Sequence, residues 1–302
     1  KEAVYASLRR QVRAINGQAV TSINNIGEAL GEDVAGLSTT FTLANAEGSV
    51  YDVEVTKQVV DINTVLHRSI IERNGKKAGY IVFNNFIERA EQELANAFQY
   101  MEQNKVDDLV LDLRYNGGGL LGLAERLGGM IAGNNVAGKL MLKVEHNELQ
   151  QQQNEDRVFA EAPLSLNLDR LVVITTDGSA SASEALINAL RPHMEVRTVG
   201  SDSYGKPVGS YGFRVEEFVV APIAFRLVNA EGLADYYQGI VADGPATDDL
   251  SRDFGDPDEA SLKEALHYLD NGSFTFTGGR LRAPRPNRQI KMHGLRREIG
   301  AF

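Results

Sequence analysis

Between residues 79 and 200, short apolar segments alternate with segments that have the periodicity of amphipathic helices. Continuous apolar runs are typical of strands that are buried on both faces of a sheet. In chain order, the predicted strands and helices alternate as Tyr80–Phe83, Glu88–Gln103, Leu109–Leu113, Leu120–Ile131, Leu171–Thr175, Ser181–Leu190 and Val196–Val199. Because helices connect successive strands, the pattern predicts an α/β fold with a mainly parallel sheet and flanking helices.

The first 58 residues lack this pattern and predict a small β-rich module. Two alternating runs, Thr39–Leu43 and Val50–Val55, predict a hairpin, and Gln11–Ile15 predicts a strand that ends at the turn signal Asn16-Gly17. With this module the chain is α+β overall. We expect three parts, with the boundaries 1–58, 59–270 and 271–302.

Other segments carry weaker signals. Ile23–Leu30 and Glu259–Leu269 have the spacing of helices, and the second would be the last helix of the chain. Val59–Lys77 is expected to be a connector with an extended stretch. Glu145–Glu161 is polar and rich in glutamine, so we expect an exposed loop there.

Composition excludes several classes of protein. The 302 residues carry a net charge of −10, which disfavours a general nucleic-acid binder. No apolar run approaches the roughly 18 residues that a membrane-spanning helix needs, so no membrane span is expected. Cysteine is absent, which excludes disulfides and thiolate catalysis. Residues 271–302 are basic, and either contact an anionic surface or form a weakly structured end.

A glycine-rich block, Asp112–Gly119, follows the predicted strand Leu109–Leu113. Its three consecutive glycines permit a tight turn and leave backbone N–H groups free to face a ligand. A plain strand-to-helix turn would need the same residues. The spacing matches neither a dinucleotide fingerprint nor a phosphate-binding loop, so the sequence predicts no nucleotide cofactor.

A second block, Gly178–Glu184, joins a predicted strand to a predicted helix and contains three serines. A hydroxyl on such a turn is exposed, and the positive helix end favours a developing negative charge. The pair Ser181-x-x-Glu184 is also a good capping box, which would explain both residues without any catalysis.

A nucleophilic serine needs a base. Of the five histidines, His193 follows Ser181 by 12 residues along the same predicted helix, roughly 18 Å away, so a Ser-His-Asp triad is unpromising. Lys206 follows Ser181 by 25 residues, across one helix and one strand. This return path places both residues at the same end of a parallel sheet. Burial would lower the pKa of the lysine and let it act as a base.

Four blocks, in this order, resemble those of the C-terminal processing peptidases, or tail-specific proteases. They are Asp112–Leu121, Leu171–Glu184, Val199–Lys206 and Tyr237–Asp243. Val12–Val20 is similar to the second half of the PDZ domain of this family. The resemblance covers residues 10–270, and its most specific part is the Ser-Ala-Ser-Ala-Ser-Glu turn followed by the spaced Gly-Lys.

The resemblance implies a serine endopeptidase with a crotonase-like or ClpP-like catalytic core. Ser181 would be the nucleophile, Lys206 the general base, and Glu184 matches a position that is a third member in some relatives. The backbone N–H groups of Gly118 and Ala182 would form the oxyanion hole. It also implies polypeptide substrates, no cofactor or metal, and export to the bacterial cell envelope or periplasm, with or without a lipid anchor.

The sequence departs from the family pattern at several positions. Gly117 and Ala242 replace prolines, Ser210 replaces a glutamine that helps to hold the lysine, and Pro192 replaces an aspartate of certain relatives. The first half of the PDZ domain would precede Val12 and has no counterpart in the glycine-free segment before it.

Two other functions stay open. A non-catalytic protein could keep the peptidase fold and bind peptides or apolar ligands. The sheet also resembles the crotonase-like architecture that handles acyl-CoA, although a shared fold does not fix function. Neither alternative explains why Ser181 is followed by a lysine at the spacing of Lys206.

Overall fold

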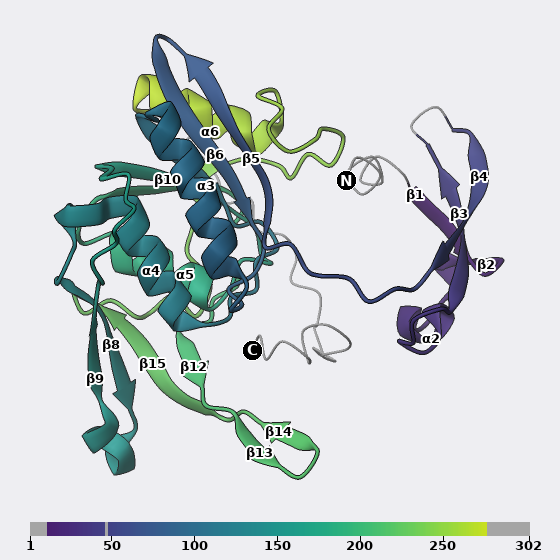
Figure 1. Ribbon diagram of the computed structural model, residues 1–302, viewed down its shortest axis with the longest axis horizontal. Helices are drawn as coiled ribbons and strands as arrows, with labels where there is room; N and C mark the ends of the chain where they lie inside the picture. Colours follow the sequence, from purple (N-terminus) through teal and green to yellow (C-terminus); the bar gives the residue numbers. More distant parts are fainter. Residues whose placement is uncertain (1–10, 46–47, 277–302) are drawn as a thin grey trace. The chain divides into compact units, whose positions relative to one another are not determined.

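The computed structural model of the chain describes residues 11–45 and 48–276. They form two compact units (Figure 1). The N-terminal unit comprises residues 11–62 with 249–253, and the main unit comprises residues 63–248 with 254–276. Of the predicted basic tail, residues 277–302 lie outside the described residues, as do residues 1–10 of the predicted β-rich module.

The N-terminal unit contains an antiparallel sheet with the order β2-β1-β3-β4. Its elements are β1 (Gln11–Ile15), β2 (Gln18–Ala19), the 3-10 helix η2 (Val20–Ser22), α2 (Ile26–Leu30), β3 (Ser38–Ala44) and β4 (Val50–Thr56). The predicted hairpin is present as β3 and β4. The helix predicted over Ile23–Leu30 is shorter, since Asn25 accepts from the Gly27 N–H and caps it at Ile26.

The main unit is built on a six-stranded sheet with the order β16-β11-β10-β7-β6-β5. Its strands are β5 (Val65–Arg73), β6 (Lys76–Phe83), β7 (Asp108–Asp112), β10 (Arg170–Thr175), β11 (Glu195–Gly200) and β16 (Gly244–Pro245). Neighbours from β16 to β6 are parallel, whereas β5 is antiparallel to β6. The predicted α/β architecture is therefore confirmed, and the sheet is mixed because β5 is antiparallel to β6.

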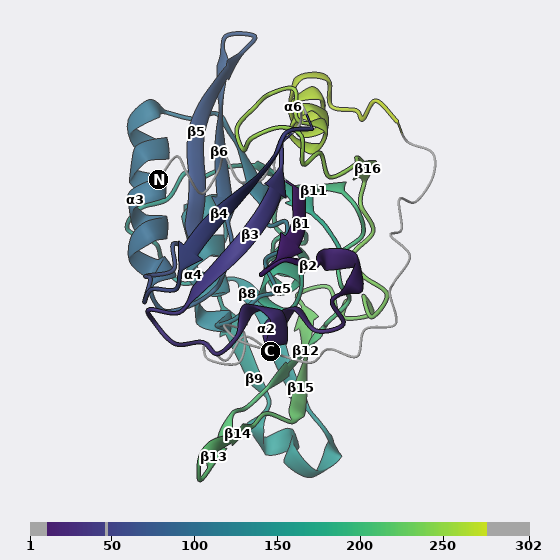
Figure 2. The same ribbon diagram turned by 90° about the vertical axis from the view of Figure 1, so that its right-hand side faces the viewer.

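Helices cover both faces of this sheet. They are α3 (Ala90–Asn104), α4 (Leu121–Ala132), α5 (Ala182–Leu190) and α6 (Ala260–Asn271), with a short 3-10 helix η3 (Gly133–Asn135) after α4. Alternate residues of β6 show the division: Ile81 packs with α3, α4 and α5, and Tyr80 packs with α6. Figure 2 shows α3 and α6 on opposite sides of β5 and β6. None of the helices among residues 11–45 and 48–276 is long and apolar enough to cross a membrane.

A second sheet, with the order β12-β15-β8-β9, is antiparallel. It contains β8 (Leu140–His146), β9 (Glu155–Val158), β12 (Val208–Ser210) and β15 (Ile223–Asn229), and a ribbon of β13 (Phe213–Val215) and β14 (Phe218–Val220) extends from it. The loop expected over Glu145–Glu161 was wrong, because that segment includes β9 and the 3-10 helix η4 (Glu148–Gln153). The extended stretch expected within Val59–Lys77 is present as β5, which is an edge strand of the main sheet.

Candidate active site

Ser181 lies on the sharp turn between β10 and α5, at the carboxyl end of the sheet. Its backbone has φ 55° and ψ −115°, a strained conformation for a residue with a side chain. Such strain at a strand-to-helix turn is typical of exposed serine nucleophiles. Ala182, the first residue of α5, finds no acceptor for its N–H among the described residues. The turn therefore offers a hydroxyl next to a free N–H donor at a positive helix end.

The glycine loop that follows β7 lies directly against this turn. A Cβ on Gly118 would approach Ser181 Cβ at 2.7 Å and Ala182 N at 2.8 Å, so only glycine fits there. The loop is held from its other side by Phe86, whose N–H donates to Gly118 O (3.1 Å) and whose carbonyl accepts from Leu120 N (2.7 Å). The structure thus brings Gly118, Ser181 and Ala182 together.

The two predicted oxyanion donors differ in their hydrogen bonds. The Gly118 N–H donates to Asn116 Oδ1 at 3.0 Å, whereas the Ala182 N–H is free as described above. Asn116 is fully buried, and its Nδ2 donates to Phe83 O at 2.9 Å. No role for Asn116 was predicted, because an asparagine in a glycine-rich turn has no distinctive pattern.

Glu184 is fully buried in the first turn of α5 and accepts four hydrogen bonds. Ser181 N and Lys206 N donate to Oε2 at 3.0 and 2.8 Å. Gly205 N (2.6 Å) and Ser203 Oγ (2.5 Å) donate to Oε1. Burial raises the pKa of Glu184, and these four donors oppose that increase. The capping interaction expected for Glu184 is present, but the carboxylate also fixes the loop that carries Lys206.

Lys206 lies in the loop between β11 and β12 and is partly buried. Desolvation lowers the pKa of its ammonium group below 10.5, and the nearby Glu184 carboxylate opposes part of this decrease. No hydrogen bond or ion pair links Lys206 Nζ to any residue within 11–45 or 48–276. A second backbone bond, from Tyr204 N to Ser179 O (2.9 Å), ties the lysine loop to the serine turn. This lysine is therefore partly desolvated, and its loop is bound to the turn that carries the predicted nucleophile.

The lysine loop packs against residues 236–243. Ser203 N donates to Ile240 O (3.0 Å), and Ile240 N donates to Ser203 Oγ (2.7 Å). Gly205 and Gly239 both have positive φ, and a Cβ on either would overlap the backbone of the facing segment. Ser203 was not predicted as a site residue, although its hydroxyl joins this segment to Glu184. Ser210, which stands where the family pattern has a glutamine, lies in β12. Among the described residues, no hydrogen bond joins it to Lys206.

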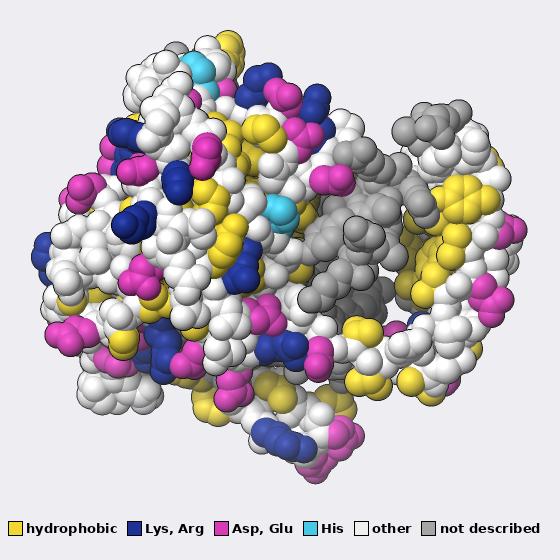
Figure 3. Space-filling model, turned by 45° about the horizontal axis from the view of Figure 1, so that its top comes forward, with side chains coloured by type: hydrophobic (Ala, Val, Ile, Leu, Met, Phe, Trp, Pro, Cys, Tyr) yellow, Lys and Arg dark blue, Asp and Glu magenta, His cyan; other side chains and the backbone are white. Residues whose placement is uncertain are grey.

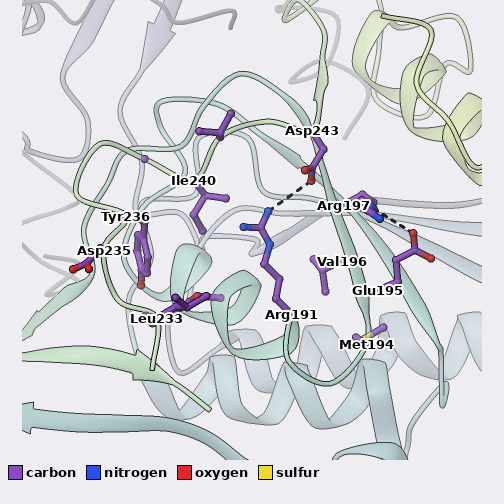
Figure 4. A pocket seen from close by; sticks show the side chains of 13 residues that line it. Arg191, Met194, Glu195, Val196, Arg197, Leu233, Asp235, Tyr236, Ile240 and Asp243 are labelled. Carbon is purple, nitrogen blue, oxygen red and sulfur yellow. Dashed lines mark hydrogen bonds and ion pairs between the residues drawn. The ribbon is translucent and has the colours of Figure 1, made fainter. Parts of the chain in front are cut away.

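Four residues of the segment 236–243, Tyr236, Gly239, Ile240 and Val241, also line a cavity of about 600 Å³ (Figure 4). Arg191 lies in it and pairs with Asp243 at 3.6 Å, and Arg197 pairs with Glu195 at 3.2 Å. Burial lowers the pKa of Arg191. The predicted nucleophile and base do not line this cavity.

A second cavity, also of about 600 Å³, is lined in part by Leu120, which follows Gly118 by two residues in the chain. Its apolar lining continues with Leu121, Leu123, Val144, Ala160, Tyr211 and Phe225. Four glutamates and two arginines also line it, and pairs such as Arg157–Glu125 (2.8 Å) join them. This cavity adjoins the glycine loop and has room for a large side chain of a bound ligand.

The surface gives no sign of an extended basic patch on the described face drawn in Figure 3, where acidic and basic side chains are interspersed. No group of three or more histidine, aspartate and glutamate side chains in the described part of the chain could hold a metal ion.

Comparisons with known proteins agree with these observations. The sequence is similar to the carboxyl-terminal-processing protease of Picosynechococcus sp., with 31% identity over 161 residues, which cover 52% of this chain and 36% of that protein. It is also similar to the carboxy-terminal processing protease CtpA of Bacillus subtilis, with 27% identity over 203 residues, or 66% of this chain and 40% of that protein. The chain thus spans less than half the length of these curated relatives.

Among solved structures, the chain is similar to a Bacteroides fragilis protein described as an S41 protease. The TM-score is 0.72 and the identity is 25%, over 88% of this chain and 74% of that chain. The sequence model described as peptidase family S41 matches residues 77–237, more than half of this chain. That range includes the glycine loop, the Ser181 turn and the Lys206 loop, and the chain belongs to peptidase family S41.

Proposed function

We propose that this chain is a serine endopeptidase in which Ser181 is the nucleophile and Lys206 the general base. The observation that carries the proposal is the Glu184 carboxylate, which binds the backbone of both residues through one oxygen. Desolvation of Lys206 supports it, because a lysine serves as a base only when its pKa is lowered.

The proposed reaction has two stages. Neutral Lys206 takes the proton of Ser181 Oγ, and the oxygen attacks the carbonyl carbon of the scissile peptide bond. The Ala182 and Gly118 N–H groups stabilise the resulting oxyanion, and each such donor is typically worth about 3 kcal/mol. The ammonium of Lys206 then protonates the leaving amine, and the C–N bond breaks. Water, deprotonated by Lys206, then attacks the acyl carbon; the ester C–O bond breaks, the Lys206 ammonium returns its proton to Ser181 Oγ, and the carboxylic acid product leaves.

Glu184 is a positioning residue in this scheme. Its carboxylate contacts backbone N–H groups, and it holds the serine turn and the lysine loop at a fixed separation. Such preorganisation lowers the barrier because the reacting groups need not reorganise during the reaction.

The substrates we propose are polypeptides. Their cleavage near C-termini is supported by the names of the two processing proteases to which the chain is similar. The apolar cavity at Leu120 would accept a substrate side chain, because it begins at the end of the glycine loop. We further propose that residues 1–58 act as a partial PDZ-like module, and residues 59–270 as the catalytic domain.

Location in the cell envelope or periplasm is part of the same proposal and rests on the family resemblance. Fractionation of cells expressing the natural protein, with the chain recovered in the cytosol alone, would contradict it. A non-catalytic peptide-binding protein is the alternative function.

The deciding experiment is cleavage of an unfolded protein substrate at pH 6 to 10 by the wild type, Ser181→Ala and Lys206→Ala. Lys139→Ala, at an exposed lysine, is the matched control. We expect cleavage by the wild type and the control only. Binding of peptide by a folded wild type that cleaves nothing would favour the alternative, and full activity in Ser181→Ala would refute the proposed nucleophile.

A further inference from the structure

Asn116 joins the two segments that carry the oxyanion donors. Its backbone carbonyl accepts from Ala180 N (3.0 Å) and from Ser183 Oγ (2.9 Å), one residue before and two residues after Ser181. Its side-chain carbonyl accepts from Gly118 N at 3.0 Å. One fully buried residue therefore binds the serine turn and the glycine loop at the same time.

The glycine loop needs such support. Residues 117–119 are consecutive glycines, and Gly118 and Gly119 have φ of 96° and 138°. Glycine has more conformational freedom than any other residue, so this loop loses the most entropy when it is ordered. Residue 117 is glycine, so no proline ring restricts the backbone at the start of this loop.

We propose that Asn116 is the positioning residue of the oxyanion hole, and that its side-chain carbonyl occupies the Gly118 N–H until substrate arrives. This proposal rests on the proposed peptidase function. An oxyanion is a stronger acceptor than a neutral amide, because hydrogen bonds to charged groups are shorter and stronger. The Gly118 N–H therefore changes its hydrogen-bond acceptor from Asn116 Oδ1 to the oxyanion as the tetrahedral intermediate forms. It donates to Asn116 Oδ1 again when the intermediate collapses.

The second amide contact keeps Asn116 in place during this exchange. Asn116 Nδ2 donates to Phe83 O (2.9 Å) at the end of β6, a buried strand of the sheet. The side chain cannot follow Gly118 when the N–H changes its acceptor. Asn116 thus stays fixed to β6 while the Gly118 N–H turns from one acceptor to the other, which limits the reorganisation that the loop needs as charge develops.

The first test compares Asn116→Ala with Asn116→Ser by steady-state kinetics on a peptide substrate. Serine keeps an oxygen that can accept from the N–H two residues on, whereas alanine does not. We expect kcat to fall about 100-fold in Asn116→Ala, with KM changed less than about threefold, and to recover to within about tenfold in Asn116→Ser.

Asn229→Ala is the matched control. Asn229 is also buried in the main unit, and its side chain also accepts backbone N–H groups, from Glu231 and Leu233. We expect it to lower the midpoint of unfolding but to leave kcat within about twofold of the wild type. Equal losses of kcat in Asn229→Ala and Asn116→Ala would mean that Asn116 acts only through stability, and would overturn the proposal.

A second test needs no variant to fold and no catalysis. Hydrogen exchange of the Gly118 amide is measured in the substrate-free wild type, and again after a peptide boronic acid forms a tetrahedral adduct with Ser181. We expect protection in both states and a change of the Gly118 amide ¹⁵N shift between them. Rapid exchange in the free protein would overturn the proposal, even where Ser181-dependent cleavage is established. Protection without any cleavage would refute the peptidase function instead.

Discussion

The backbone N–H groups of Ser181 and Lys206 donate to the same oxygen atom, Oε2 of Glu184. The distance between the two nitrogens is therefore at most the sum of these two hydrogen-bond lengths, 3.0 and 2.8 Å, although 24 residues lie between Ser181 and Lys206 in the chain. The other carboxylate oxygen is also used twice, by Ser203 Oγ and Gly205 N. Both oxygens of Glu184 thus face donors only.

This arrangement predicts that Glu184→Gln is a damaging substitution despite its similar shape. Whichever way the amide turns, its NH₂ group faces at least one backbone N–H that can only donate, from Gly205 or from Ser181 and Lys206, and each unsatisfied buried donor costs about 1 to 3 kcal/mol. We expect a loss of about 2 kcal/mol or more in unfolding free energy and a fall of kcat of about tenfold or more. Urea unfolding and steady-state kinetics measure the two effects.

Glu264→Gln is the control for that substitution. Glu264 is also buried, but within the described part of the chain it accepts from the N–H and the hydroxyl of Thr275 alone, and that hydroxyl can rotate to accept instead of donating. It lies in α6, on the opposite face of the sheet from α5. We therefore expect Glu264→Gln to keep the kcat of the wild type. A Glu184→Gln enzyme as active as this control would show that the shared carboxylate does not position the active site.

The lowered pKa of Lys206 predicts the pH dependence of peptide hydrolysis. Only the neutral amine accepts a proton from Ser181, so kcat/KM rises with pH as Lys206 deprotonates. Because desolvation lowers this pKa, the midpoint of the rise lies below 10.5. A kcat/KM profile from pH 6 to 11 measures it. A profile that is flat, or that rises only above pH 10.5, would contradict the role of Lys206 as base.

The same desolvation predicts a gain in stability when the base is removed. At pH values between the lowered folded-state pKa of Lys206 and its ordinary pKa of 10.5, the unfolded chain binds more protons than the folded chain. The free energy of unfolding therefore rises with pH in that range. At lower pH the burial of the charged amine destabilises the fold. Lys206→Met removes that charge and keeps the chain volume, so we expect an inactive protein with a higher unfolding midpoint at pH 7. A lower midpoint would mean that Lys206 stabilises the fold.

The sequence predicted the elements around the site well because each has a strong local signal. The β10 segment contains a continuous apolar run before the serine turn, the α5 segment after the turn is mostly apolar, and the capping pair Ser181 and Glu184 marks the start of the helix. One of the elements that were missed carries no such signal. β9 has the sequence Glu-Asp-Arg-Val and is mostly exposed, so its pairing with β8 depends on a tertiary contact.

The hydrogen bonds of the site were harder to predict than its residues. The capping box correctly paired Glu184 with Ser181, but nothing local indicates that the same carboxylate binds Lys206 and Gly205. Asn116 lies in the glycine-rich block Asp112–Gly119, but no role was predicted for it. Its partners are Phe83 and residues of the serine turn, which are distant in sequence. Long-range partners of polar groups become visible only once the sheet brings the loops together.

The close approach of the lysine loop to residues 236–243 predicts that Gly239→Ala is destabilising. Gly239 has a φ of 94°, and a Cβ there would overlap Ser203 O. We expect a loss of about 2 kcal/mol or more and a lower kcat, because Ser203 holds Glu184. Gly232→Ala is the control, since its φ is 81° and no atom lies within 4 Å of the added Cβ. It should lose only about 1 kcal/mol and keep its kcat, and equal kcat values would argue against coupling through Ser203.

The contact of Gly118 with the serine turn predicts that Gly118→Ala abolishes hydrolysis without unfolding the chain. The added Cβ would lie 2.7 Å from Ser181 Cβ and 2.8 Å from Ala182 N, so the glycine loop must move away from the nucleophile. Moving one oxyanion donor costs about 100-fold or more in kcat. Gly75→Ala separates this effect from backbone strain, because Gly75 also has a positive φ (76°) but adjoins open space in the β5–β6 turn. We expect Gly75→Ala to retain wild-type kcat, measured with the same peptide at the same pH. Retention of activity in Gly118→Ala as well would remove Gly118 from the oxyanion hole and leave Ala182 as its donor.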